Sequence, residues 1–218
     1  MRTTPGVGGV DRIFGYPGDG INGLIGAVAN TKGKLDFVQV RHEEQAGFMA
    51  TAHAKYTGRV GVCLATSGPG AIHLLNGLYD AKLDHVPVVA IVGQAATTAM
   101  GGDYQQEVDL QSLFKDVASE YLITVNNPMQ VRMAVDRALR TAVAQRSVTA
   151  IIVPKDVQEM PAVTKPPHKH NTHHTGLGFR PDASSRTMPN CDARPTSSMP
   201  ARGSRSSSAP APTARRTK

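Results

Sequence analysis

Residues 38–47 read Val-Gln-Val-Arg-His-Glu-Glu-Gln-Ala-Gly, and they predict a buried strand that runs directly into a helix. The apolar and β-branched residues up to Val40 are typical of a strand, whereas the residues from His42 onward favour a helix. The acid at this junction, Glu43, is therefore expected at the carboxyl edge of a parallel sheet, where α/β folds bind their ligands. The simpler interpretation is an N-terminal acid stabilised by the helix dipole, for which Glu44 is an equal candidate.

Strand-like and helical segments alternate along the chain from residue 12 to residue 153. Strands are expected at 12–15, 36–41, 60–65, 87–93, 121–125 and 149–153, with helical segments between them. Their apolar character on both faces is typical of a parallel sheet that is covered on both sides. With right-handed crossovers, the prediction is an α/β fold with a doubly wound, parallel six-stranded sheet in a three-layer α/β/α arrangement. The loops at 16–20, 41–44, 66–70 and 94–106 should share one edge.

Composition divides the chain into an irregular N-terminus (1–9), a folded domain (10–162) and a basic C-terminal tail (163–218). Ten of the 24 Lys and Arg residues but two of the 17 Asp and Glu residues lie in the tail. The formal charge of +7 therefore belongs to the tail, which we expect to be disordered because it lacks an apolar pattern. Nucleic acid is not expected as a partner, since the domain itself is near neutral.

The N-terminal residues lack the apolar run of a leader, and no run long enough to span a membrane is visible. One of the two cysteines, Cys63, lies in an apolar strand and the other, Cys191, in the tail, so a disulfide is not expected. We therefore expect a cytoplasmic protein. Four of the eight histidines lie at 168–174; such tracts bind metals, but nothing in the sequence fixes ligand positions, and no metal site is assigned.

One alternative rests on the spacing Gly18-x-Gly20-x-x-Gly23, which follows a strand and opens a helix. With an acid about twenty residues further on, it matches a dinucleotide-binding fingerprint and would make the chain an NAD- or FAD-binding α/β domain. Against this, Pro17 lies within the turn, where it removes a backbone donor and restricts its neighbour.

Five stretches stand in the order and spacing of one family. They are 14–18 (Phe-Gly-Tyr-Pro-Gly), 40–44 (Val-Arg-His-Glu-Glu), 66–81 (Thr-Ser-Gly-Pro-Gly-Ala-Ile-His-Leu-Leu-Asn-Gly-Leu-Tyr-Asp-Ala), 85–94 (His-Val-Pro-Val-Val-Ala-Ile-Val-Gly-Gln) and 104–107 (Tyr-Gln-Gln-Glu). Together they resemble the N-terminal, pyrimidine-binding domain of thiamine-diphosphate enzymes of the pyruvate oxidase and acetolactate synthase group. The pyruvate oxidase branch is the closer likeness.

The resemblance implies a role for each matching residue. Glu43 would be the catalytic residue, which hydrogen-bonds N1′ of the thiamine diphosphate pyrimidine ring. Tyr16, Pro69 and His73 would line the pyrimidine pocket, and Gln106 would face the substrate, a 2-oxo acid such as pyruvate. The structural alternatives are that Tyr16 and Pro69 only shape turns and that His73 is a helix-surface histidine.

The family also implies components that we do not find in this sequence. The aromatic residue expected before Gln106 is replaced by Gln105. The domains that bind FAD and diphosphate with Mg²⁺ are not found, so the complete site would need the diphosphate-binding domain of another chain, as in the family's homo-oligomers. We therefore expect an oxidoreductase-type half-site that is inactive alone. The abrupt change of composition near Arg180 is the basis for one hypothesis, that the chain is a truncated product with a tail read out of frame.

Overall fold

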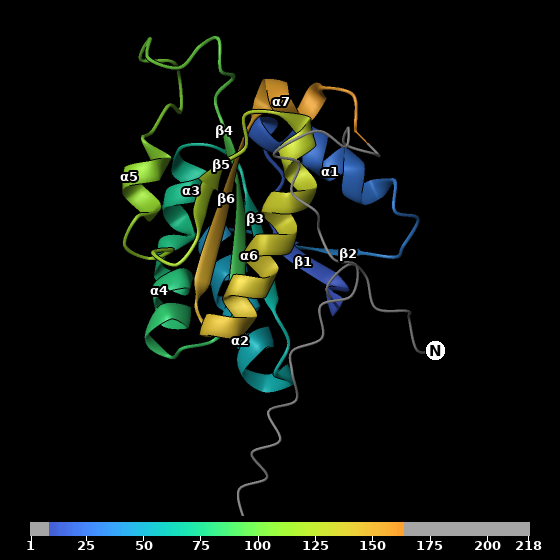
Figure 1. The fold of residues 1–218 in the computed structure, drawn as a ribbon, viewed down its shortest axis with the longest axis vertical. Coiled ribbons are helices and arrows are strands. Elements are labelled where there is room, and N and C mark those ends of the chain that lie inside the picture. Colours follow the sequence, from blue (N-terminus) through green and yellow to red (C-terminus); the bar gives the residue numbers. More distant parts are fainter. Residues whose placement is uncertain (1–8, 164–218) are drawn as a thin grey trace, which may run out of the picture. The chain divides into compact units, whose positions relative to one another are not determined.

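A computed structural model of the chain describes residues 9–163 and confirms the predicted parallel α/β fold (Figure 1). The predictions for the irregular N-terminus and for the basic tail, including its histidine tract, fall almost wholly outside these residues. Within the described part, no helix is both long enough and apolar enough to cross a membrane.

Six parallel strands form one sheet in the order β2-β1-β3-β4-β6-β5. The strands are β1 (Arg12–Gly15), β2 (Asp36–Gln39), β3 (Gly61–Ala65), β4 (Val88–Gln94), β5 (Leu122–Thr124) and β6 (Val148–Pro154). The chain first moves outward from β1 to β2 and then returns to the other side of β1 for β3. This reversal between β1 and β3 is the kind of position at which open α/β sheets bind ligands.

Helices cover both faces of the sheet, as the apolar strands predict. The α2 face carries α2 (Glu43–Thr57), α3 (Pro69–His73), α4 (Leu75–Leu83) and α5 (Leu110–Phe114). The α1 face carries α1 (Asn22–Ala29), α6 (Val131–Gln145) and the short α7 (Lys155–Glu159). The single-turn 3-10 helices η2 (Asp19–Ile21) and η3 (Pro128–Gln130) precede α1 and α6. The predicted three-layer arrangement is thus confirmed.

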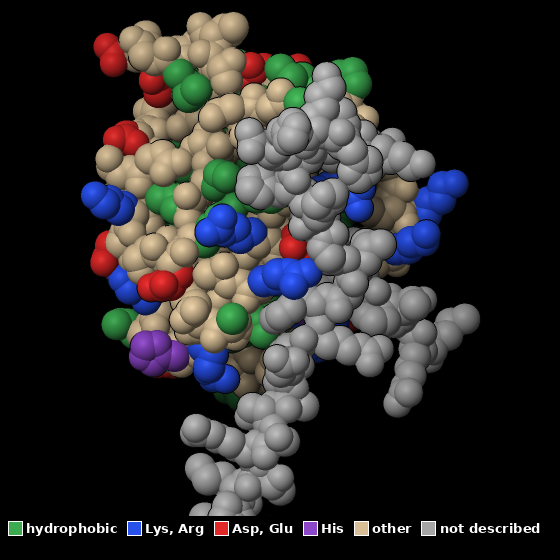
Figure 2. Space-filling view, in the orientation of Figure 1, with side chains coloured by type: hydrophobic (Ala, Val, Ile, Leu, Met, Phe, Trp, Pro, Cys, Tyr) green, Lys and Arg blue, Asp and Glu red, His purple; other side chains and the backbone are tan. Residues whose placement is uncertain are grey.

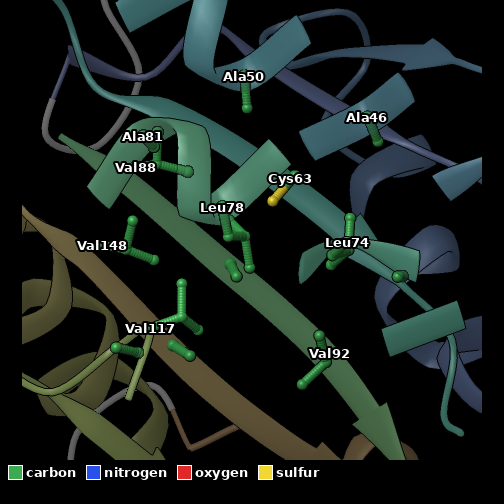
Figure 3. Packing of buried hydrophobic residues seen from close by; sticks show 14 of the residues in the cluster. Ala46, Ala50, Cys63, Leu74, Leu78, Ala81, Val88, Val92, Val117 and Val148 are labelled. Carbon is green, nitrogen blue, oxygen red and sulfur yellow. The ribbon is translucent and has the colours of Figure 1, made fainter. Parts of the chain in front are cut away.

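Side chains of the central strands alternate between the two halves of the core. On β3, Cys63 packs on the α2 face and Leu64 on the α1 face. Figure 3 shows Cys63 among Leu74 and Leu78 of the α4 region and Val88 of β4. Burial raises the pKa of the Cys63 thiol to about 12, so this group is an uncharged apolar side chain at neutral pH.

Two glycines bring α2 and α4 into backbone contact. A Cβ atom added at Gly77 would lie 2.4 Å from the carbonyl carbon of Gly47 and from the nitrogen of Phe48. The Thr51 hydroxyl lies 2.8 Å from the Gly77 carbonyl oxygen and 3.0 Å from that of Gly47, so it joins the two helices at the same point. The relative position of α2 and α4 is therefore set by the absence of side chains at this crossing.

Three details differ from the sequence prediction. The helix expected after β3 is divided at Leu74 into α3 and α4, and the helix expected from Pro128 begins as η3. The short α7 was not predicted, because only Val157 of its five residues is buried and an apolar period cannot be seen. On the face drawn in Figure 2, basic and acidic side chains of the described residues are interspersed, as the near-neutral charge of the domain predicts.

We expect Gly77→Ala to lower the free energy of unfolding by about 1–3 kcal/mol, because the added methyl group meets backbone atoms that cannot rotate away. Urea unfolding followed by circular dichroism measures this change. Gly26→Ala is the matched control, since its Cβ would have no atom within 4 Å in α1. That variant should gain about 0.5–1 kcal/mol from helix propensity. Equal effects of the two substitutions would contradict the proposed crossing.

Candidate functional site

The loops after β1 and β3 are packed directly on each other at the carboxyl edge of the sheet. The backbone N–H of Gly20 donates a hydrogen bond of 3.0 Å to the Thr66 hydroxyl oxygen. A Cβ atom on Gly18 would lie 2.6 Å from the Thr66 Cβ. The early glycines are therefore required for contact with the β3 loop.

The same contacts explain the dinucleotide-like glycine spacing. A Cβ atom on Gly20 would lie 2.7 Å from the Ser67 hydroxyl, and one on Gly23 would lie 2.7 Å from the Gln158 Cβ. The Gln158 side-chain amide also donates to the Gly20 carbonyl oxygen at 2.9 Å. Since the chain's own atoms occupy the space beside these glycines, the spacing does not favour an NAD or FAD site.

Glu43 begins α2 and lies among the residues of this edge. It is the one charged residue among the five buried polar or charged residues of the described chain, with 8% of its surface exposed. The N-terminus of α2 is capped by His42 and not by Glu43, because His42 Nδ1 accepts a hydrogen bond of 3.3 Å from the Glu44 N–H. Glu44 lies beside Asn76, whose side-chain amide donates to it at 2.6 Å. The two adjacent acids thus have different surroundings, and Glu43 is the buried one.

The carboxylate of Glu43 is held between α3 and the β3 loop. Its Oε2 lies 3.0 Å from His73 Nδ1, the last residue of α3. Its Oε1 lies 3.3 Å from the position that a Cβ atom on Gly70 would take. The same Cβ atom would lie 2.6 Å from Thr66 Cγ2, so a glycine at position 70 is required for the close packing of Glu43 and Thr66 against the start of α3.

His42 and His73 lie next to each other above this carboxylate. Their ring centroids are 4.4 Å apart, with an angle of 30° between the ring planes. His42, Glu43 and His73 each offer one metal-ligating atom, and these atoms lie within 4.8 Å of one another. Glu43 and His73 are predicted from the sequence but His42 is not, since a histidine before an acidic pair is not distinctive until α3 is placed beside it.

The structure places the other predicted residues on the neighbouring loops. Tyr16 follows β1 and is 38% exposed, and Pro69 is the first residue of α3, directly before Gly70. Gln106 lies on the loop between β4 and α5, and its side-chain oxygen is 3.4 Å from the Ser67 hydroxyl. Glu43 and His73 thus contact each other, whereas Tyr16, Pro69 and Gln106 lie on the segments that follow β1, β3 and β4 at the same edge of the sheet.

Main-chain contacts fix the loop that carries Gln106. Gln106 has a left-handed backbone (φ 64°), and its carbonyl oxygen would be 2.6 Å from a Cβ atom on Gly68, which is itself left-handed (φ 60°). At the base of the loop, the Gln94 side chain accepts from the Ala95 N–H and donates to the Val108 carbonyl oxygen, both at 2.9 Å. Gln94 was missed as a positioning residue because it reads only as the polar end of an apolar strand.

Comparison with known proteins gives a consistent result. Residues 8–113 match the family described as "Thiamine pyrophosphate enzyme, N-terminal TPP binding domain". The chain is 42% identical over 156 residues to the pyruvate oxidase of Lactiplantibacillus plantarum, covering 71% of this chain and 26% of that protein. It is 40% identical over 149 residues to the acetolactate synthase large subunit of Corynebacterium glutamicum (68% and 24%) and 39% identical over 165 residues to the acetolactate synthase of Mycobacterium avium (74% and 26%). It spans about a quarter of the length of these relatives.

We expect Glu107→Gln to loosen the loop that carries Gln106. The Glu107 carboxylate accepts hydrogen bonds from the backbone N–H groups of Gly101 (2.6 Å) and Tyr104 (3.0 Å), and these bonds lower its pKa below the ordinary 4.5. A lowered pKa in the folded state means that the stabilisation is complete above pH 4.5 and is lost as the pH falls through the lower, folded-state value.

Amide exchange measures this effect at Gly101 and Tyr104. At neutral pH the protection factors of these two amides should be lower in Glu107→Gln than in the unaltered chain. In the unaltered chain they should fall only under acid conditions. Glu120→Gln serves as the control, because Glu120 is an exposed acid outside this loop. Unchanged protection in Glu107→Gln would show that the carboxylate does not hold the loop.

Proposed function

Since residues 8–113 belong to the N-terminal thiamine pyrophosphate-binding domain of the thiamine pyrophosphate enzymes, we propose that this chain provides the pyrimidine-binding half of a thiamine diphosphate site. Glu43 is the residue proposed to contact the pyrimidine ring. The observation that carries the proposal is the buried carboxylate of Glu43 at the carboxyl edge of β2, beside the β1–β3 reversal.

The residues around Glu43 fit a heteroaromatic ring that carries nitrogen atoms. One carboxylate oxygen is oriented by His73, and the other lies beside the backbone of Gly70, at the start of α3. A buried carboxylate with one oxygen engaged by a histidine is suited to share a proton with a ring nitrogen through the other. Tyr16 and Pro69, on the loops after β1 and β3, are in position to contribute apolar surface at the rim.

Thiamine diphosphate, when bound, supplies the nucleophilic carbon for cleavage next to the carbonyl group of a 2-oxo acid. The chain's own contribution is to hold a proton at the Glu43 carboxylate and to keep this group in one orientation through His73. His73 can do so as a neutral imidazole whose Nδ1–H donates to Oε2. Gln106 presents an amide from a loop that its backbone holds in place, and we propose that this amide meets the substrate.

A pyruvate-type 2-oxo acid is the proposed substrate class, in line with the names of the pyruvate oxidase and acetolactate synthase relatives. The proposed enzyme is an oxidoreductase or synthase of this type. The diphosphate and Mg²⁺, and FAD in a pyruvate oxidase, would be bound by surfaces outside residues 9–163, including a second subunit. The domain limits (10–162 with a tail at 163–218), the homo-oligomer and the cytoplasmic location stay predictions.

The test is ligand-observed NMR with thiamine and with its isolated aminopyrimidine fragment, each added to the purified chain. We expect weak binding of both ligands. Glu43→Gln should weaken it about 10- to 100-fold, because a hydrogen bond to a charged group contributes about 1.5–3 kcal/mol. Glu44→Gln, the neighbouring acid that lies beside Asn76, should leave it unchanged. Equal binding by the two variants would exclude Glu43 as the contact residue.

A parallel titration with NAD tests the remaining alternative. Gly18, Gly20 and Gly23 are packed against Thr66, Ser67 and Gln158, so we expect no NAD binding under conditions in which the aminopyrimidine fragment binds. NAD binding that is stronger than aminopyrimidine binding would overturn the proposed function.

A further inference from the structure

Two imidazoles and one carboxylate meet at the start of α2. His73 Nδ1 and Glu43 Oε2 are 3.0 Å apart, and the ligand atoms of His42, Glu43 and His73 all lie within 4.8 Å of one another. Two ligands of one tetrahedral zinc ion are separated by roughly 3.3 Å, given Zn–N and Zn–O bonds of about 2.0–2.2 Å. Two of the three ligand atoms are therefore already close to the spacing that a zinc ion requires.

The third ligand would come from rotation of the His42 side chain, which gives up its capping contact with the Glu44 N–H. His42 is exposed, and its Nδ1 makes one long contact of 3.3 Å with the Glu44 N–H. Its ring already lies 4.4 Å from that of His73, centroid to centroid. Both backbones are fixed nearby, because Glu43 lies one turn before Gly47 and His73 one turn before Gly77, the two glycines at which the helices touch. The group is thus held together by the fold.

The charges around the three residues favour a cation on balance. Glu43 and Glu44 are both in the first turn of α2, and their negative charges outweigh the positive partial charge of the helix N-terminus. Arg41 precedes the group and is exposed, so solvent screens its charge. Nitrogen ligands select zinc, nickel, copper or cobalt over magnesium and calcium, which prefer oxygen.

We propose that His42, Glu43 and His73 form a three-ligand site for a divalent transition-metal ion, with zinc as the reference ion and water in the open fourth position. Such a site differs from one for magnesium and diphosphate. The functional consequence of metal binding rests on the proposed function. A metal ion and a pyrimidine ring cannot both occupy the Glu43 carboxylate, so the ion would act as a competitive inhibitor of pyrimidine binding.

Metal binding is to be measured on the full chain with His168, His170, His173 and His174 replaced by Gln, because His-rich tracts of this kind can bind metals and would obscure the result. Zinc affinity follows from competition with a chromogenic chelator, and visible absorption of bound Co²⁺ reports the geometry. We expect one ion per chain and a tetrahedral cobalt spectrum. His42→Gln and His73→Gln should each weaken zinc binding about tenfold or more.

His85→Asn is the matched control, since His85 is exposed at the end of α4 and has a left-handed backbone that Asn tolerates. It should bind zinc as the parent does. Circular dichroism checks that each variant is folded. If His73→Gln loses stability, His42→Gln still tests the site, because His42 is exposed. Absent zinc binding in the parent, or equal affinity in the His42 and His85 variants, would overturn the proposal.

A competition experiment separates this inference from the proposed function. Zinc is added to the chain while aminopyrimidine binding is followed by NMR, with Mg²⁺ as the ionic control. Displacement by zinc and not by magnesium is expected. Zinc binding without displacement would refute the shared use of Glu43, whereas aminopyrimidine binding without any zinc binding would refute the metal site and leave the proposed function standing.

Discussion

The backbone contact between α2 and α4 is the constraint on which the rest of the site depends. Gly47 and Gly77 meet where a side chain on either helix would collide with the other. On its other side α2 lies against β3, since a Cβ atom on Gly61 would be 2.1 Å from the Ala50 carbonyl oxygen. These two contacts fix the position of α2, and with it the backbone of its first residue, Glu43. Glu43 is buried because α2 packs closely against both β3 and α4.

The partner of this buried acid is a histidine, and this choice has chemical consequences. A guanidinium group would hold both carboxylate oxygens in a bidentate pair. His73 engages one oxygen and leaves the other beside Gly70, so the carboxylate is oriented without being saturated. The same incompletely satisfied group can accept a ring nitrogen or a metal ion. The two proposals made above therefore describe two ligands for a single arrangement of atoms.

Much of the fold and part of the site could be predicted from the sequence, for identifiable reasons. Apolar runs such as 61–65 and 88–94 can only be buried on both faces, and that requires a parallel sheet with helices on each side. The same reasoning predicts Glu43 at the carboxyl edge of the sheet, where the structure has it. The glycine spacing at 18–23 was ambiguous, because a spacing does not show which atoms fill the space beside each glycine. Thr66, Ser67 and Gln158 fill it.

Other features could not be predicted because they depend on contacts between distant residues. His42 acquires a neighbour only when α3 is placed against α2, and 31 positions separate it from His73 in the chain. Gln94 holds both ends of a loop, yet nothing local distinguishes it from any polar strand end. Short elements such as α7 bury too little surface to leave an apolar pattern. Local patterns therefore report which surfaces are buried, and tertiary contacts decide which polar groups meet.

Gln106 is held through its main chain, so the position of its loop does not depend on the chemical nature of its side chain. Main-chain atoms of Gln106 press on Gly68, while the side chain remains at the surface. Evolution can thus exchange the chemical group offered at this position without rebuilding the scaffold beneath it. The left-handed backbone limits the choice, since Asn, Asp, His and Gly accept such a conformation readily and β-branched residues do not. Diversification at this point should therefore avoid β-branched residues.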